Sequence, residues 1–124
     1  MKLAIPIKMN KENSAVAPLF GKAKWFAIVD NGELMIIPNN QSGGQAVIEW
    51  LSEMKVDALL IQEMGLKPYE KIKAYGTMAL YHTGFERILL NDVLEKFRNN
   101  TLEILDDTNM DEIIQHHEKR HPRH

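Results

Sequence analysis

The sequence predicts an α/β fold built on a five-stranded mixed sheet. Short apolar runs alternate with amphipathic segments along the 124 residues, which is typical of βαβ units. Asn31-Gly32 separates two strand-like segments and predicts a tight hairpin, because both central positions of a type I′ turn need positive φ. Three strands come first, and helices and strands then alternate. Right-handed parallel crossovers give the sheet order 3-2-1-4-5, in which strand 2 is antiparallel.

The expected strands share a high content of β-branched and other apolar side chains. Near-continuous apolar runs such as Ala58–Ile61 are typical of strands that are buried on both faces. A short extra strand is expected at 101–105. The five main strands are expected at 2–9, 25–30, 33–38, 57–62 and 77–82.

Two capping-box patterns predict helix starts. Ser42-Gly43-Gly44-Gln45 predicts a helix that runs to about Lys55, and Thr83-Gly84-Phe85-Glu86 predicts a helix over 86–99. A short helix is expected between Pro68 and Gly76. We expect an α/β domain over 1–105, followed by a C-terminal helix and a His-rich tail over 106–124.

Composition excludes several classes of protein. The net charge of −2 argues against binding of nucleic acid through bulk charge. The chain has no cysteine, so it cannot build a disulfide scaffold or a Cys-ligated metal site. No apolar run approaches the roughly 18 residues of a membrane span. We expect a cytoplasmic protein that binds neither nucleic acid nor membrane.

Four segments follow the carboxyl ends of parallel strands and should converge on one edge of the sheet. The sheet changes its direction of growth between strands 1 and 4, and ligands of open α/β sheets bind at such switch points. The segments are polar or contain glycine, and they span 10–24, 39–44, 63–66 and 82–85.

Several residues of these segments have both a functional and a structural interpretation. Gly43-Gly44 at a helix start exposes N–H groups to an anion, or is ordinary cap chemistry. His82 ends a strand as a metal ligand or bonds to nearby backbone. Met64 is a soft ligand or core filling. Lys22 and Lys24 steer an anion or are simply solvated.

The tail contains the pattern H-E-x-x-H. On a helix, His117 and His121 would share a face and could bind zinc, with Glu118 as base. The third ligand of a protease is missing except for His124, and Pro122 disfavours helix at His121. Chelation of a metal by the tail and a solvated tail both remain open. A nuclease is excluded, because no set of carboxylates converges on the central strands.

The segments around the predicted crevice resemble those of the dinitrogenase iron–molybdenum cofactor-binding family. Phe20-Gly21-Lys22-Ala23 is the most specific match, and the resemblance covers roughly residues 1–105. Leu19 stands where many members have His, and Thr83-Gly84 reverses the order expected after the fifth strand. The other similar segments are 1–8, 14–19, 24–30, 39–45, 64–65, 86–99 and 101–102.

The resemblance implies a three-layer α/β/α, ribonuclease-H-like fold and a binding protein that is not an enzyme. It implies nitrogenase-accessory-like binding of an anionic metal cluster or precursor, such as an iron–sulfur or iron–molybdenum-type cluster. The partners would be the cluster or the proteins that carry it. A regulatory module without a cluster and a His-tail chelator are the alternatives. We expect metal ligands at His82, His117 and His121. The expected cofactor-binding residues are Phe20, Gly21, Lys22, Ser42, Gly43, Gly44, Met64, Gly65, His82, Thr83 and Gly84.

Overall fold

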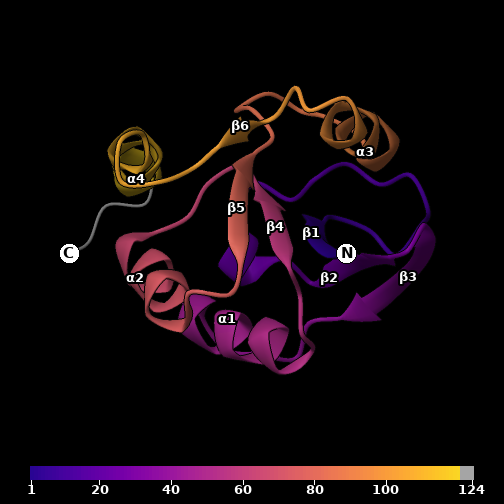
Figure 1. Cartoon of the computed structure of the whole chain (residues 1–124), viewed down its shortest axis with the longest axis horizontal. Helices are drawn as coiled ribbons and strands as arrows, with labels where there is room; N and C mark the ends of the chain where they lie inside the picture. Colours follow the sequence, from indigo (N-terminus) through magenta and orange to yellow (C-terminus); the bar gives the residue numbers. More distant parts are fainter. Residues whose placement is uncertain (121–124) are drawn as a thin grey trace.

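A computed structural model describes residues 1–120 of the chain (Figure 1). The six-stranded sheet has the order β3-β2-β1-β4-β5-β6. The helices are α1 (Gly44–Glu53), α2 (Leu66–Tyr75), α3 (Leu90–Arg98) and α4 (Met110–Arg120), with a 3-10 turn η1 (Phe20–Lys22). The strands are β1 (Lys2–Ile7), β2 (Trp25–Asp30), β3 (Glu33–Pro38), β4 (Ala58–Ile61), β5 (Ala79–His82) and β6 (Glu103–Ile104).

The sheet confirms the predicted fold class and strand order. Strand β2 is antiparallel to both β1 and β3, whereas β1, β4 and β5 are parallel. The predicted short strand at 101–105 is β6, which pairs antiparallel with β5 and makes the sheet six-stranded. The hairpin between β2 and β3 turns at Asn31 and Gly32 with φ of 51° and 86°, as the dipeptide predicts.

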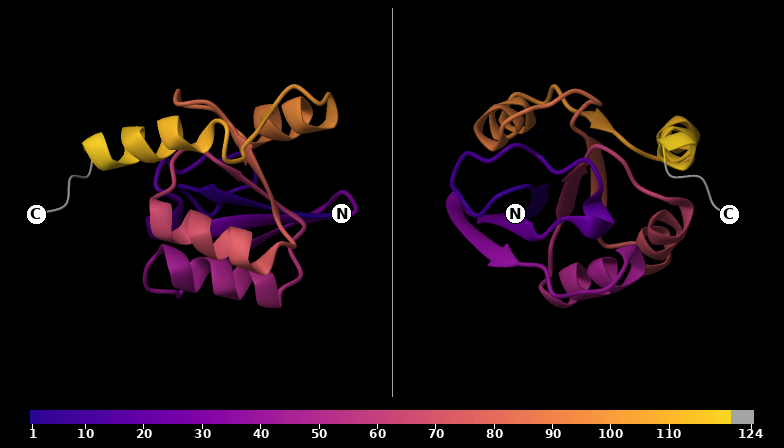
Figure 2. Two further views of the ribbon diagram at one scale, coloured as in Figure 1. Left: turned by 60° about the vertical axis from the view of Figure 1, so that its left-hand side comes forward. Right: turned by 180° about the vertical axis from the view of Figure 1, so that it is seen from behind.

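Helices cover both faces of the sheet. Helices α1 and α2 lie side by side on one face, and α3 lies on the other (Figures 1 and 2). The alternation of side chains along the strands explains this division. Ala4, Phe26 and Leu59 point to the α1–α2 side, and Ile5 and Leu60 point to the α3 side. No helix within residues 1–120 is long and apolar enough to cross a bilayer.

Helix α4 packs into the core through one of its faces. Met110, Ile113 and Ile114 are 1%, 2% and 8% exposed and join the cluster on the α1–α2 side of the sheet. The spacing of these residues places them on one face of the helix. The charged residues at the two ends of the helix suit its dipole, but its apolar face determines where it packs.

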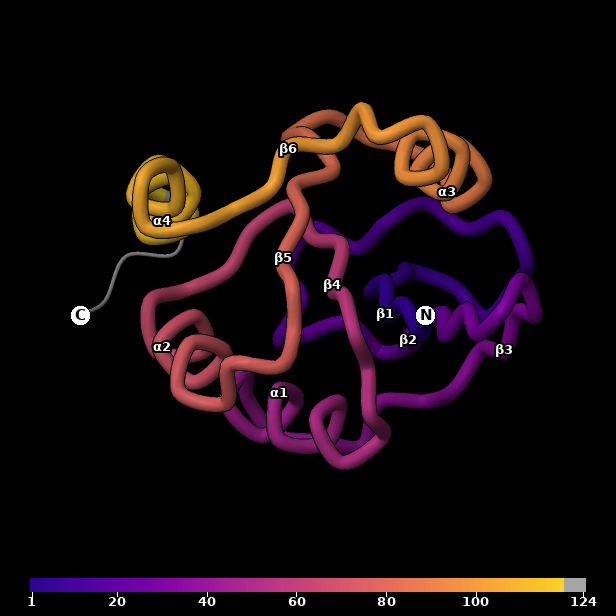
Figure 3. Tube along the Cα trace, in the orientation of Figure 1, coloured from indigo at the N-terminus to yellow at the C-terminus, as the bar shows by residue number. Residues whose placement is uncertain are grey.

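The long connection between β1 and β2 is held against the sheet (Figure 3). The amide of Ala17 donates to the carbonyl of Pro6 at 2.8 Å, and the amide of Val16 donates to the carbonyl of Ile88 at 2.9 Å. Ser14 is fully buried, and its Oγ accepts a hydrogen bond from the amide of Met9 at 3.0 Å. The connection therefore delivers η1 to the sheet edge as an ordered segment.

Both predicted capping boxes are wrong. Helix α1 has Gly43 as its N-cap, with φ of 90°, rather than Ser42. No helix begins at Thr83, because the chain continues without regular structure to the N-cap Leu89 of α3. The predicted stop of α2 at Gly76 is confirmed by its left-handed φ of 67°. Pro68 occupies the third position of α2, since that helix begins at Leu66.

Candidate functional site

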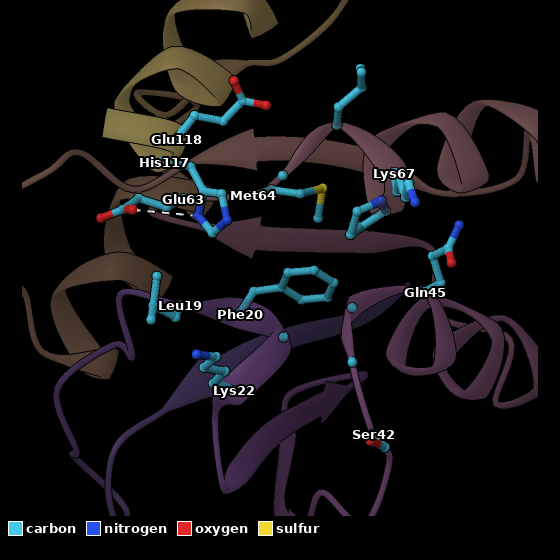
Figure 4. A pocket seen from close by; sticks show the side chains of 16 residues that line it. Leu19, Phe20, Lys22, Ser42, Gln45, Glu63, Met64, Lys67, His117 and Glu118 are labelled. Carbon is cyan, nitrogen blue, oxygen red and sulfur yellow. Dashed lines mark ion pairs between the residues drawn. The ribbon is translucent and has the colours of Figure 1, made fainter. Parts of the chain in front are cut away.

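A cavity of about 410 Å³ opens at the carboxyl end of the parallel strands (Figure 4). Its walls come from Leu19 and η1, the start of α1, the connection from β4 into α2, and α4. Eight of the predicted cofactor-binding residues line it: Phe20, Gly21, Lys22, Ser42, Gly43, Gly44, Met64 and Gly65.

Close approach of backbone segments creates this cavity. A Cβ on Gly21 would lie 3.1 Å from Cα of Gly44, and a Cβ on Gly44 would lie 2.5 Å from Cγ of Pro68. The absent side chains allow η1, the start of α1 and the start of α2 to meet. The isolated bridge between Leu19 and Glu63 aligns the η1 segment with the end of β4.

Two helix N-termini face this space. The N-caps of α1 and α2 are Gly43 and Gly65, which have no side chain that could cap the helix. The amides of a first helical turn carry a partial positive charge and lack partners within the helix. Such ends bind anions through backbone N–H groups. Two helix ends with a partial positive charge therefore face the same cavity.

Side chains of both charges surround the helix ends. Lys22 and Lys67 line the cavity and are exposed, so they can approach an anion while they keep their solvation. Glu118 is also exposed, whereas Glu63 is 1% exposed. The charged side chains do not make the pocket uniformly basic, so the backbone N–H groups of the two helix starts are the part of the cavity best suited to an anion.

The buried Glu63 carboxylate contacts two histidines of α4. His116 Nε2 lies 3.7 Å from Oε2 of Glu63, and His117 Nδ1 lies 3.6 Å from Oε1. These are ion-pair distances when the imidazoles are protonated. Buried carboxylates require compensation of this kind. The pairs fix α4 over the end of β4 and bring His117 to the cavity wall.

His82, Thr83 and Gly84 do not line the cavity, which corrects their predicted grouping with the other site residues. The imidazole of His82 packs against Phe85 with ring centroids 4.6 Å apart, and Phe85 lies 4.0 Å from the ring of His116. Within residues 1–120, His82 Nε2 and Thr83 Oγ1 are buried without a hydrogen-bond partner. Burial lowers the pKa of His82 from 6.5, against a smaller opposing effect of a hydrogen bond with the Gln62 backbone.

The predicted metal ligands do not form a centre among the described residues. Within residues 1–120, no group of three or more His, Cys, Asp or Glu side chains could hold a metal ion. His117 lines the cavity, His82 lies apart from it, and His121 falls outside the described residues.

Several residues that line the cavity were not among the predicted cofactor-binding residues, although some of them fall in the segments that were expected to converge. The polar residues near the helix starts belong to no sequence motif and are marked only by their proximity to Gly44 and Gly65. Helix α4 reaches the cavity through tertiary packing, which no local pattern reveals. The missed lining residues are Leu19, Gln45, Glu63, Leu66, Lys67, Pro68 and Glu118.

The family profile described as dinitrogenase iron-molybdenum cofactor matches residues 1–100. The chain belongs to this family. The resemblance in the sequence is thus confirmed, and the match includes η1 and the starts of α1 and α2. It ends before α4. A search of curated proteins found no match.

Solved structures share the fold of this member of the dinitrogenase iron-molybdenum cofactor family. A NifB-like protein of the DUF35 family from Thermotoga is 26% identical with a TM-score of 0.71, over 84% of this chain and 92% of that one. The apo orange protein from Desulfovibrio gigas is 17% identical with a TM-score of 0.74, over the same shares of the two chains, 84% and 92%. The second likeness shows the fold alone.

Proposed function

We propose that the protein binds an anionic metal cluster or cluster precursor, of the iron–molybdenum cofactor type, in the cavity lined by η1, α1, α2 and α4. The function is carriage of the cluster and involves no catalysis. The cluster is the cargo of the protein, and the proteins that make or receive it are the partners.

The observation that carries the proposal is the convergence of two helix N-termini with glycine N-caps on one cavity. Family membership supports a cluster as the anion. A cavity of about 410 Å³ falls within the roughly 300–1,000 Å³ of ligand pockets. Met64 adds a polarisable thioether to the wall, which suits a sulfide-rich surface.

A charge placed at Gly65 tests the proposal. The φ of −78° and ψ of 171° at this N-cap suit any residue, and a Cβ there would make ordinary contacts of 3.5 Å with His117. Gly65→Asp adds a negative charge to the cavity and also caps α2, so the fold should be kept. Gly65→Asn is the matched control, because it has the same shape without the charge.

The measurement is anaerobic binding of a synthetic cubane iron–sulfur cluster with thiolate ligands and a net negative charge. We expect retention by the wild type and Gly65→Asn, and binding about tenfold weaker by Gly65→Asp, which corresponds to ~1.4 kcal/mol. Iron and molybdenum are also assayed in protein purified anaerobically from its host. Absence of metal there, together with no uptake of the synthetic cluster, would refute the proposal.

A protein-interaction module without a cluster is the second candidate. Edge strand β3 exposes Leu34 and Met35, which are 38% and 58% exposed. Apolar side chains on an open edge favour addition of another strand. This candidate predicts that binding of a partner protein responds to Met35→Lys and is indifferent to Gly65→Asp.

A further inference from the structure

The second half of α4 adds a wall to the cavity that the matched family region does not contain. The family profile ends at residue 100, and α4 begins at Met110. His117 and Glu118 nevertheless line the cavity. The cavity is therefore completed by an element outside the part of the chain that resembles other members.

The position of α4 is fixed independently of the cavity. Ile113 and Ile114 are buried in the core one turn before His117. In the segment that leads into α4, Asp107 accepts hydrogen bonds from Tyr69 Oη at 2.6 Å and from Lys73 Nζ at 3.1 Å. Contacts on both sides of the helix start thus hold α4 against α2 and give His117 a defined place.

The imidazole of His117 lies between Glu63 and the start of α2 (Figure 4). Its Nδ1 is 3.6 Å from Oε1 of the buried Glu63. Its opposite edge, Cδ2 and Nε2, lies 3.5 Å from the position of a Cβ on Gly65. One nitrogen therefore faces the carboxylate, and the other is on the side of the helix end that lines the cavity.

This arrangement favours one tautomer of the ring. A carboxylate beside Nδ1 stabilises a proton on that atom, and Nε2 then carries the lone pair. Histidines that bind metals commonly have a carboxylate behind the distal nitrogen, which orients the ring and raises its basicity. His117 is the one histidine among the described residues that line the cavity.

We propose that His117 Nε2 is a ligand to a metal of a cluster that brings its own sulfide or oxide ligands. The inference rests on the proposed function. The proposed occupant is a cluster rather than a bare ion, because residues 1–120 hold no group of three side chains that could bind a bare ion. A cluster that keeps its own sulfide and terminal ligands can be held by one protein ligand together with backbone N–H groups of the cavity. With the synthetic thiolate-ligated cluster used in the test, the Nε2 lone pair forms the new bond to iron, and one terminal thiolate of the cluster leaves with its electron pair and takes a proton from water.

The test compares His117→Gln with His116→Gln in the full chain. Both histidines contact Glu63, but only His117 lines the cavity, so the second variant controls for loss of an ion pair. Each variant is loaded anaerobically with the synthetic thiolate-ligated cubane cluster. The amount of cluster that stays with the protein after desalting compares the strength of binding. Electron–nuclear double resonance of the reduced cluster, in protein with isotope-labelled histidine, detects histidine nitrogen bound to the metal. Circular dichroism melts establish that both variants fold.

We expect histidine nitrogen coupling in the wild type and in His116→Gln. His117→Gln should lose the coupling and bind the cluster at least tenfold more weakly. Retention of the coupling in a folded His117→Gln would overturn the assignment while the cavity remained a cluster site. Loss of cluster uptake by the wild type itself would overturn the proposed function and the assignment with it.

Discussion

Gly44 is the residue at which three segments of the cavity meet. A Cβ there would lie 2.5 Å from Cγ of Pro68 and 3.3 Å from Cε1 of Phe20. Helix propensity alone would favour alanine by up to about 1 kcal/mol. The proline ring is rigid, however, so we expect the steric clash to outweigh the gain in helix propensity and the substitution to destabilise the fold.

Gly44→Ala should lower the free energy of unfolding by about 1–3 kcal/mol, which is the usual range for overpacking. Urea titration followed by far-UV circular dichroism measures this change. Gly65→Ala is the matched control and should change stability by less than about 0.5 kcal/mol, because its Cβ makes only ordinary contacts. Equal effects in both variants would contradict the steric explanation.

His82 should make stability depend on pH. Burial lowers its pKa in the folded state, so the unfolded chain takes up the proton first as the pH falls below about 6.5. The free energy of unfolding then declines with falling pH, since the unfolded state binds more protons. We expect His82→Gln to lose less stability than the wild type between about pH 7.5 and pH 5.5.

Urea titrations at several pH values give this comparison. The contacts of His116 and His117 with Glu63 are present in both proteins, so the comparison reports chiefly on His82. Parallel pH profiles for the two proteins would show that His82 titrates alike in the folded and unfolded states.

At the scale of elements, α4 has an apolar half that belongs to the core and a polar half that reaches the cavity. Ending the chain after Asn109 removes Met110, Ile113 and Ile114 from the core. Ending it after Gln115 leaves these residues in place and removes only the polar half.

We expect the shorter chain to lose at least about 3 kcal/mol of stability, because removal of a single buried Ile or Met side chain costs roughly 2–5 kcal/mol. The longer chain should lose much less, because it gives up chiefly the contacts of His116 and His117 with Glu63. Urea midpoints and m-values distinguish the two. Similar losses in both chains would mean that the polar half anchors the helix.

The start of α3 was not predicted because it depends on tertiary contacts. Helix α3 begins where the loop after β1 supplies its hydrogen bonds: the amide of Leu90 donates to the carbonyl of Ser14 at 2.9 Å, and the amide of Asn91 donates to Asn13 Oδ1 at 2.9 Å. These partners are more than 70 residues away in sequence. A capping box such as that at Thr83 involves four consecutive residues, so it gives no information about hydrogen bonds from a distant segment. Thr83 instead extends the sheet, since its amide donates to the carbonyl of Ile61.

At the scale of the molecule, the strand order could be predicted because it follows from the sequence of elements, the hairpin signal and the handedness of crossovers. The convergence of three loops followed from the same topology. The place of His82 and His117 could not be predicted. The end of β5 meets α4 through Phe85, which contacts both His82 and His116. The position of α4 depends on how Ile113 and Ile114 pack against distant residues.

The cavity draws on segments from both ends of the described chain, so a bound ligand should stabilise the whole fold. At a free cluster concentration one hundred times Kd, the gain is about 2.7 kcal/mol. For a domain of this size it should raise Tm by roughly 5–15 °C. An anaerobic thermal melt with and without the synthetic cluster measures this shift, and Gly65→Asp should show a smaller one at the same concentration. An unchanged wild-type Tm at saturating cluster would contradict binding to the folded state.

The central place of β1 in the sheet has a consequence for the nascent chain. One edge of β1 pairs with β2 as soon as the hairpin segment is available, but its other edge waits for β4, and the amide of Lys2 bonds to Asp57 across 55 residues. A chain that emerges from the ribosome would therefore carry an open apolar strand edge until β4 has also emerged. Such an edge is a template for aggregation. Synthesis of this protein should be most vulnerable, and most dependent on chaperones, during that interval.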